Sequence, residues 1–294
     1  DRWAIQNDLF SLCVSGDEKV RNYLDFSDAY FDEDSYLASV NVAHNLASLY
    51  FRTFDEKFVE EIRSYAINYF RKILSNLGWE PQKSDKHTDA LLRTFTISVL
   101  GKMNDDTVTD DAIRKYQKFL KSPSSLSPDL IETICSIAAW NGNSKTFAEL
   151  KKLYTNAKTM EEKLRFLGAM CGFQDKKLLV RTLNFSQTSE VRSQNMQLPI
   201  MKVAGNPYGE KVLWPWLKKN WKNINKKVGH GNPLFNRIVA SIAGVADDSM
   251  EKEIKVFFKN NPTPGTERTQ SQTLERIRIN SKFLRTMRKE FKNG

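Results

Sequence analysis

Three histidines, His44, His87 and His230, are the side chains that could bind a metal or move a proton near neutral pH. A helical zinc site of the HExxH type needs two imidazoles four residues apart on one helix face. His44 lies in VAHNLASLYF, where Asn45 and Ser48 occupy the positions of the motif's Glu and second His. His87 lies in a polar turn and His230 beside glycines, and no pair has metal-ligand spacing. We therefore expect no metal or other cofactor in this chain.

The thiols and carboxylates do not form a catalytic pattern either. Cys13, Cys135 and Cys171 are odd in number, widely spaced and set among apolar residues, which favours buried free thiols in a reducing compartment. The acid pairs 105–106 and 110–111 flank an expected helix start, where the helix dipole stabilises negative charge. GxGxxG, GxxxxGK[ST] and GxSxG are absent. The sequence predicts no self-sufficient active site.

Residues 205–229 hold three tryptophans and six lysines. This composition suits a nucleic-acid-binding surface, a membrane-surface helix or a core helix with a solvent-exposed basic face. Plotted as a helix, the apolar residues share one stripe, with Trp216 at its edge, and the lysines lie away from it. The stripe is Leu213, Leu217, Trp221, Ile224 and Val228, and the lysines are Lys218, Lys219, Lys222 and Lys226. This arrangement favours a core helix over a nucleic-acid-binding surface.

The formal net charge of +10 is unevenly distributed. Residues 205–294 carry 18 Lys and Arg against 8 Asp and Glu, whereas residues 1–204 carry 27 of each. The first 50 residues are acidic, with nine acids against three bases. Such polarity can steer an acidic partner to one end of the chain, or it can reflect solvated helix faces.

The elements that must position these residues are helical nearly throughout. Long helices are expected at 34–51 and 55–77, and shorter helices follow in pairs of about 30–35 residues. Ser127-Pro128 predicts a helix start, and Thr159 with Glu162 predicts a capping box. No persistent period-2 alternation supports strands. We expect an all-α, HEAT/armadillo-like solenoid of paired antiparallel helices forming a concave bowl.

The expected organisation is one helical-repeat domain over 1–294, with long helices in 1–122 and shorter pairs in 123–294. No run of about 18 apolar residues suggests a membrane span, and the first residues lack the pattern of a signal peptide. Because the chain starts without Met on a segment that already predicts helix, we expect a fragment cut at a domain boundary.

Five sequence blocks, in order, resemble the C-terminal region of M1-family zinc aminopeptidases. The clearest is GNPYGEKVLWPWLKKNW, which is similar to that family's NPxG turn and WxFLxxNW helix. Trp216 stands where Phe is common, and Pro215 departs from the pattern and should kink the helix or confine its regular pairing. The others are DRWAIQNDLFSLCVSG, LGWEPQKSDKHTDALLR, EIKVFF and RTQSQTLERIRINSKFL.

The resemblance implies a non-catalytic domain that caps an active-site cleft, encloses the substrate cavity and helps bind the distal part of peptides. The HExxH…E zinc site would lie in an upstream catalytic domain that this chain lacks. The implied partners are that domain and peptide substrates, in the cytoplasm. The lysine-rich form is similar to microbial tricorn-interacting factors, which implies a larger proteolytic complex such as tricorn.

Arg268 and Arg237 are the candidates for peptide-binding side chains facing the cavity, and structural ion pairs are the alternative. Two other functions remain open. The first is a free-standing helical-repeat scaffold that binds an acidic protein or nucleic acid. The second is an enzyme with an unrecognised site, which no constellation of residues supports.

Overall fold

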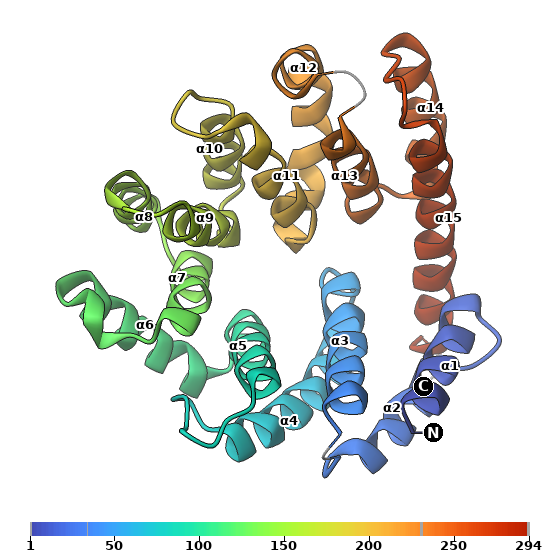
Figure 1. The fold of residues 1–294 in the computed structure, drawn as a ribbon. Helices are drawn as coiled ribbons and strands as arrows, with labels where there is room; N and C mark the ends of the chain where they lie inside the picture. The colour runs from blue at the N-terminus through green and yellow to red at the C-terminus, as the bar shows by residue number, and fades with distance from the viewer. Residues whose placement is uncertain (1, 34, 230–231, 293–294) are drawn as a thin grey trace. The chain divides into compact units, whose positions relative to one another are not determined.

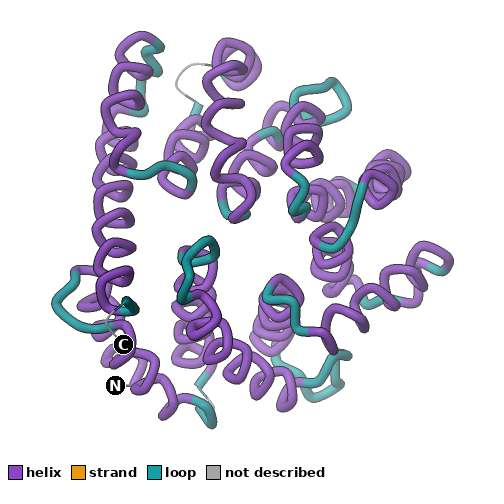
Figure 2. Tube along the Cα trace, turned by 180° about the vertical axis from the view of Figure 1, so that it is seen from behind, coloured by secondary structure: helices purple, strands orange, loops and turns teal. Residues whose placement is uncertain are grey.

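The computed structural model describes residues 2–33, 35–229 and 232–292. All regular structure in these ranges is helical, with α-helices and short 3-10 turns (η) joined by loops (Figure 2). The predicted all-α fold class is confirmed. No helix in the described part of the chain is long and apolar enough to cross a membrane.

The chain divides into two compact units. Unit 1 is formed by residues 1–137 and 282–294, and unit 2 by residues 138–281. Both boundaries fall inside helices, one in α7 (Ile131–Trp140) and the other in α15 (Glu267–Glu290). The single domain, the solenoid and the bowl expected from the sequence stay predictions.

Unit 1 contains the helices near the start of the chain, which have 14 or more residues except for one of eight (Figure 1). They are α1 (Arg2–Ser15), α2 (Val20–Ser27), α3 (Tyr36–Arg52), α4 (Val59–Leu77), α5 (His87–Lys102) and α6 (Asp106–Lys121). The short turns of this unit are η1 (Asp28–Tyr30), η2 (Pro123–Ser125) and η3 (Pro128–Leu130). Helices α3 and α4 match the expected helices 34–51 and 55–77. Helix α3 contacts α4, α4 contacts α5, and α5 contacts α6.

Of two local predictions in unit 1, one was wrong. His87 does not lie in a turn but begins α5, because the Asp89 carboxylate accepts a hydrogen bond from the Lys86 backbone N–H at 2.8 Å and caps the helix. The helix start predicted at Ser127-Pro128 is confirmed, since Ser127 is the N-cap residue and Pro128 the first residue, although the Ser127 side chain accepts no capping hydrogen bond. Pro128 begins the 3-10 turn η3, which leads into α7.

A buried arginine holds the turn after α4. The Arg93 side chain is 1% exposed and donates to the carbonyl oxygens of Leu77 at 2.9 Å and Gly78 at 3.0 Å. It also donates to the Asp85 carboxylate at 2.7 Å. These bonds satisfy carbonyls at the end of α4, where no further helical N–H is available. The LGW…LR block therefore contains a structural joint.

The acid pair 105–106 has the role expected of it at the start of α6, whereas the pair 110–111 lies in the second turn of that helix. Asp105 is the N-cap of α6, accepts a hydrogen bond from the Val108 N–H at 3.0 Å and pairs with Arg71 at 2.6 Å. Asp111 pairs with Arg114 within the same helix. Negative charge at the helix start is stabilised by the dipole.

Up to the start of α15, unit 2 consists of helices of 13 residues or fewer, except for one helix of 19 residues. They are α8 (Ser144–Asn156), α9 (Met160–Ala169), α10 (Lys176–Ser186), α11 (Gln197–Ala204), α12 (Glu210–Val228), α13 (Pro233–Ser241) and α14 (Glu251–Asn260). The turns are η4 (Met170–Gly172), η5 (Ser193–Asn195), η6 (Pro207–Gly209), η7 (Ile242–Gly244) and η8 (Asp248–Met250). Helices α9 and α11, α10 and α12, and α11 and α13 contact one another. The predicted capping box of Thr159 and Glu162 is confirmed at the start of α9.

The NPYG block before α12 is a second structural joint. The Asn206 side-chain amide donates to the carbonyl oxygens of Cys171 and Phe173, each at 2.9 Å, and its oxygen accepts from the Tyr208 N–H. A Cβ at Gly209 would lie 1.9 Å from the carbonyl oxygen of Val203. The backbone of α11 therefore approaches the turn too closely for any other residue.

Helix α12 continues through Pro215, which lies on its exposed side. The predicted stripe is confirmed for Leu213, Leu217, Trp221 and Ile224, which are all buried, while Val228 is only partly covered. Trp214 also faces the protein and is 2% exposed, since it packs edge-on against Phe257 of α14. Its indole N–H donates to Glu253 at 3.2 Å. All three tryptophans of α12 thus belong to the interior of unit 2.

Candidate functional site

The histidines and cysteines do not come together. His44 lies on the exposed side of α3 with its ring 4.2 Å from that of Phe95, and partial desolvation lowers its pKa. His87 is an exposed residue at the start of α5, and His230 lies outside the described residues. No three His, Cys, Asp or Glu side chains of the described ranges are grouped so that they could hold a metal ion. The described residues therefore offer no set of ligands for a zinc ion. The resemblance places the zinc site in an upstream domain.

All three cysteines are buried free thiols, as predicted. Burial, with the nearby carboxylates of Glu18 and Glu290, raises the pKa of Cys13 to about 12. Burial likewise raises the pKa of Cys135. Because the thiolate is the nucleophilic form, these groups are unreactive near neutral pH.

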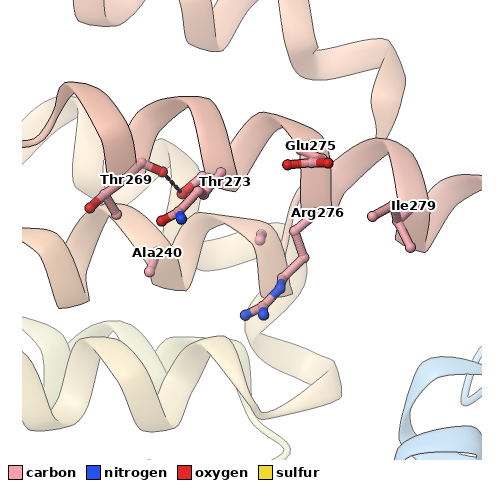
Figure 3. Close-up of a pocket in the computed structure, with 8 residues that line it drawn as sticks. Ala240, Thr269, Thr273, Glu275, Arg276 and Ile279 are labelled. Atoms are coloured by element: carbon pink, nitrogen blue, oxygen red, sulfur yellow. Dashed lines mark hydrogen bonds between the residues drawn. The ribbon is translucent and has the colours of Figure 1, made fainter. Parts of the chain in front are cut away.

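The strongest candidate site is a pocket of about 420 Å³ in unit 2, between α13 with η7 and the first half of α15 (Figure 3). Its lining residues are Ala240, Ala243, Thr269, Gln272, Thr273, Glu275, Arg276 and Ile279. We call it the α13–α15 groove. It offers one guanidinium, one carboxylate, hydroxyls and a side-chain amide next to small apolar surface.

Three hydrogen bonds hold the walls of the groove together. The Thr269 hydroxyl donates to the Asn236 side chain at 2.6 Å, and the Thr273 hydroxyl to the Val239 carbonyl at 3.4 Å. The Asn280 amide donates to the carbonyl of Ala243 in η7 at 3.1 Å. The residue numbers of the three donors and of their three acceptors increase in the same order. Helices α13 and α15 therefore run in the same direction. The groove is therefore formed by packed helices rather than by loops.

Arg276 is the main polar group of the groove. Its side chain extends from α15 away from Glu275 and is exposed (Figure 3). No residue of the described part forms an ion pair with its guanidinium. Gln272 lies one turn before it and Ile279 one turn after it on the same helix face. An unpaired guanidinium next to apolar surface can bind a carboxylate through two parallel hydrogen bonds while an apolar group packs beside it.

The structure does not place the two predicted arginines in the groove. Arg237 lies on α13 one turn before Ala240, Arg268 lies on α15 one turn before Gln272, and both side chains are exposed. They extend basic surface from one end of the groove. Arg276 was not among the predicted residues, although it lies on the same face of α15 as Arg268 and Gln272, at a spacing of four residues.

A second pocket, of about 680 Å³, lies in unit 1 beside the end of α15. Its charged side chains are largely engaged with each other, since Arg288 forms a two-pronged ion pair with Glu56. Phe58 stacks on Phe291 at 4.6 Å between ring centroids. These contacts indicate a structural role in fastening the end of the chain.

Comparison with known proteins gives a consistent result. The family model "ERAP1-like C-terminal domain" matches residues 1–279. The chain is 26% identical over 301 residues to Aminopeptidase M1 of Arabidopsis thaliana, covering 99% of this chain and 34% of that protein. It is 29% identical over 303 residues to Aminopeptidase M1-C of rice, Oryza sativa subsp. japonica, with the same coverage.

A fungal relative gives a similar match. The chain is 24% identical over 291 residues to the protein named Aminopeptidase 2, mitochondrial, of Saccharomyces cerevisiae, covering 97% of this chain and 30% of that protein. The chain thus spans about a third of the length of the curated relatives it matches.

Proposed function

Because this chain belongs to the ERAP1-like C-terminal domain family, we propose that it is the non-catalytic C-terminal domain of an M1-type zinc aminopeptidase. In this role it caps the active-site cleft, encloses the substrate cavity and contacts the distal part of a peptide whose N-terminal residue is removed elsewhere. The observation that carries the proposal is the family match over residues 1–279, together with the coverage of about a third of each relative.

The α13–α15 groove supports the peptide-binding part of the proposal. A peptide that enters with its N-terminus at a distant catalytic centre presents its C-terminal carboxylate and last side chain to the cap. Arg276 supplies a guanidinium for that carboxylate, and Ala240 and Ile279 supply apolar contact for the side chain. Arg237 and Arg268 would strengthen the attraction at one end of the groove without direct contact.

The zinc ion of such an enzyme would activate the attacking water. Since the described residues of this chain do not fit a zinc site, no step of the proposal runs through a metal held here. The contribution of the chain is to bind, orient and enclose the substrate, which excludes water from the reacting centre.

Peptide binding to the full 294-residue chain tests the role of the groove. An unstructured nonapeptide with a free C-terminus should bind more tightly than the same peptide with a C-terminal amide, as measured by isothermal titration calorimetry. Arg276→Gln should remove that difference, because glutamine still offers side-chain N–H donors but lacks the positive charge. Equal binding of both peptides by the unaltered chain would contradict the proposed carboxylate site.

A second experiment tests the absence of catalysis. The purified chain should contain no stoichiometric zinc by elemental analysis and should not cleave an aminoacyl reporter. Turnover that scales with the amount of chain and survives replacement of His44, His87 and His230 would contradict a purely non-catalytic role. The upstream catalytic partner, a larger complex such as tricorn and the cytoplasmic location stay predictions.

A further inference from the structure

Three neighbouring helices of unit 2 carry most of the excess positive charge of the chain. Helices α10, α12 and α14 hold twelve Lys and Arg against three Glu, while the formal net charge of the whole chain is +10. Helix α10 contacts α12, and Trp221 of α12 packs edge-on against Phe257 and Phe258 of α14. The structure thus concentrates the positive charge on adjacent helices. Helices α12 and α14 belong to the basic last third of the sequence, and α10 precedes it.

The exposed face of α12 is a row of lysines. At about 100° per residue, five lysines fall within an arc of about 100°, and the row is roughly 22 Å long. The α12 lysine row is Lys211, Lys218, Lys219, Lys222 and Lys226, all exposed. The single acid of this helix, Glu210, is its first residue and lies off the row. A surface of one charge sign therefore extends along four turns.

One member of the row already binds a carboxylate. Lys218 pairs with Glu253 of α14, and Lys255 of the same helix pairs with Glu251. Lys219 and Lys222, by contrast, form no ion pair with any residue in the ranges 2–33, 35–229 and 232–292. The same holds for Lys226. The row is thus open toward the C-terminal end of α12.

We infer that the α12 lysine row docks an acidic polypeptide segment rich in Asp and Glu. Successive members such as Lys222 and Lys226 are separated by about 6 Å along the helix axis. Alternate residues of an extended chain are separated by roughly 6.6 to 6.8 Å. A segment with an acid at every second position can therefore place its carboxylates opposite successive lysines.

Two other anionic partners fit this surface less well. Single-stranded nucleic acid binds through exposed aromatic rings on which bases stack, but Trp214, Trp216 and Trp221 are no more than 6% exposed. A helix that lies in a membrane surface inserts its apolar face into the lipid, whereas the apolar face of α12 is buried in unit 2. The row also lacks arginine, whose forked donors match phosphate oxygens.

The inference is independent of the proposed function, because the α12 lysine row shares no residue with the α13–α15 groove. Its test uses the full chain and a fluorescein-labelled decapeptide of alternating Glu and Ser, with binding followed by fluorescence anisotropy. The row variant is Lys219→Gln/Lys222→Gln/Lys226→Gln. The control variant is Lys83→Gln/Lys118→Gln/Lys121→Gln, which removes the same charge from exposed lysines of unit 1.

The row variant should bind the peptide about tenfold more weakly, since each exposed ion pair contributes modestly. The control variant should change the affinity less than twofold, and increased salt should weaken binding by the unaltered chain. A variant with arginine at the three row positions should retain binding, because the charge is kept. Circular dichroism checks that each variant has the helical content of the unaltered chain.

Four results would overturn the inference. They are no detectable binding of the acidic peptide, equal weakening by the row and control variants, loss of binding in the arginine variant, or tighter binding of another polyanion. The polyanions to compare at the same salt concentration are a 20-residue oligothymidylate and vesicles containing phosphatidylserine.

Discussion

The side-chain amide of Asn206 donates a hydrogen bond at 2.9 Å to the carbonyl oxygen of Cys171, 35 residues earlier in the chain. A second bond of equal length reaches the carbonyl of Phe173. One side chain thus joins the turn before α12 to the segment between α9 and α10. The sequence block that most strongly indicated the family therefore has a structural role.

Replacement of Asn206 by alanine should lower the free energy of unfolding by about 2–3 kcal/mol, because two buried carbonyls lose their donors. Asn206→Asp should cost more, since a carboxylate would face the same two oxygens. Urea unfolding followed by tryptophan fluorescence measures both. The exposed Asn223→Ala is the control, with an expected change within about 0.5 kcal/mol. An equal effect at both positions would contradict the structural role.

Gly209→Ala should destabilise the protein by about 3 kcal/mol or more, because its Cβ would lie 1.9 Å from the carbonyl oxygen of Val203. Gly205→Ala is a matched control four residues earlier. There the nearest atom would be 3.7 Å from the new Cβ, and φ is −86°, which alanine adopts readily. The control should be neutral or stabilising by about 0.4–1 kcal/mol. Thermal unfolding of the two variants gives the comparison.

Acid stability should depend on Glu251. Hydrogen bonds from Arg278, then from Lys255, lower its pKa from 4.5 to about 2. Since the folded-state pKa is depressed, the stabilisation is present above about pH 4.5 and is lost as the pH falls toward 2. Glu251→Gln should therefore flatten the decline in unfolding free energy over that window.

Urea unfolding at several pH values between 2 and 6 checks this expectation. The control is Asp129→Asn, which removes one negative charge at an exposed position. This variant should show the same dependence of the unfolding free energy on pH as the unaltered chain. An unchanged slope in Glu251→Gln would contradict the assignment. Carbon NMR of the Glu251 carboxyl provides a direct measurement of its titration.

The three thiols should not react with Ellman's reagent in the native protein at pH 8. Cys13, Cys135 and Cys171 are buried, and burial raises the pKa of Cys13 and of Cys135, which disfavours their thiolates. Unfolding in guanidinium chloride should expose all three. Rapid labelling of any thiol before unfolding would contradict its burial in the native protein.

Helical phase was sufficient to predict much of the fold. The stripe that contains Leu217 and Trp221 was correct because an amphipathic helix exposes its pattern in the local sequence. His87 was misplaced because a polar run favours turns as well as helix starts, and the Asp89 cap decides between them.

The candidate site was harder to predict than the fold. Arg237, Arg268 and Arg276 are all basic residues on helices, and their sequence does not indicate which of them borders a pocket. That depends on the contact of α13 with α15, such as the bond between Thr269 and Asn236, which are 33 residues apart. Long-range packing of this kind leaves no periodic signal in the chain.

The division of unit 1 into residues 1–137 and 282–294 has a consequence for synthesis on the ribosome. The Val20 and Arg21 N–H groups at the N-terminus of α2 donate to the Glu290 carboxylate at 3.0 and 2.8 Å. These hydrogen bonds can form only after residue 290 has been synthesised. At roughly 5–20 residues per second, the ribosome needs on the order of 10 s to pass from the first part of unit 1 to the second. Unit 2 is continuous in sequence and emerges during this interval. The unit whose synthesis begins first is therefore the last to receive all of its residues.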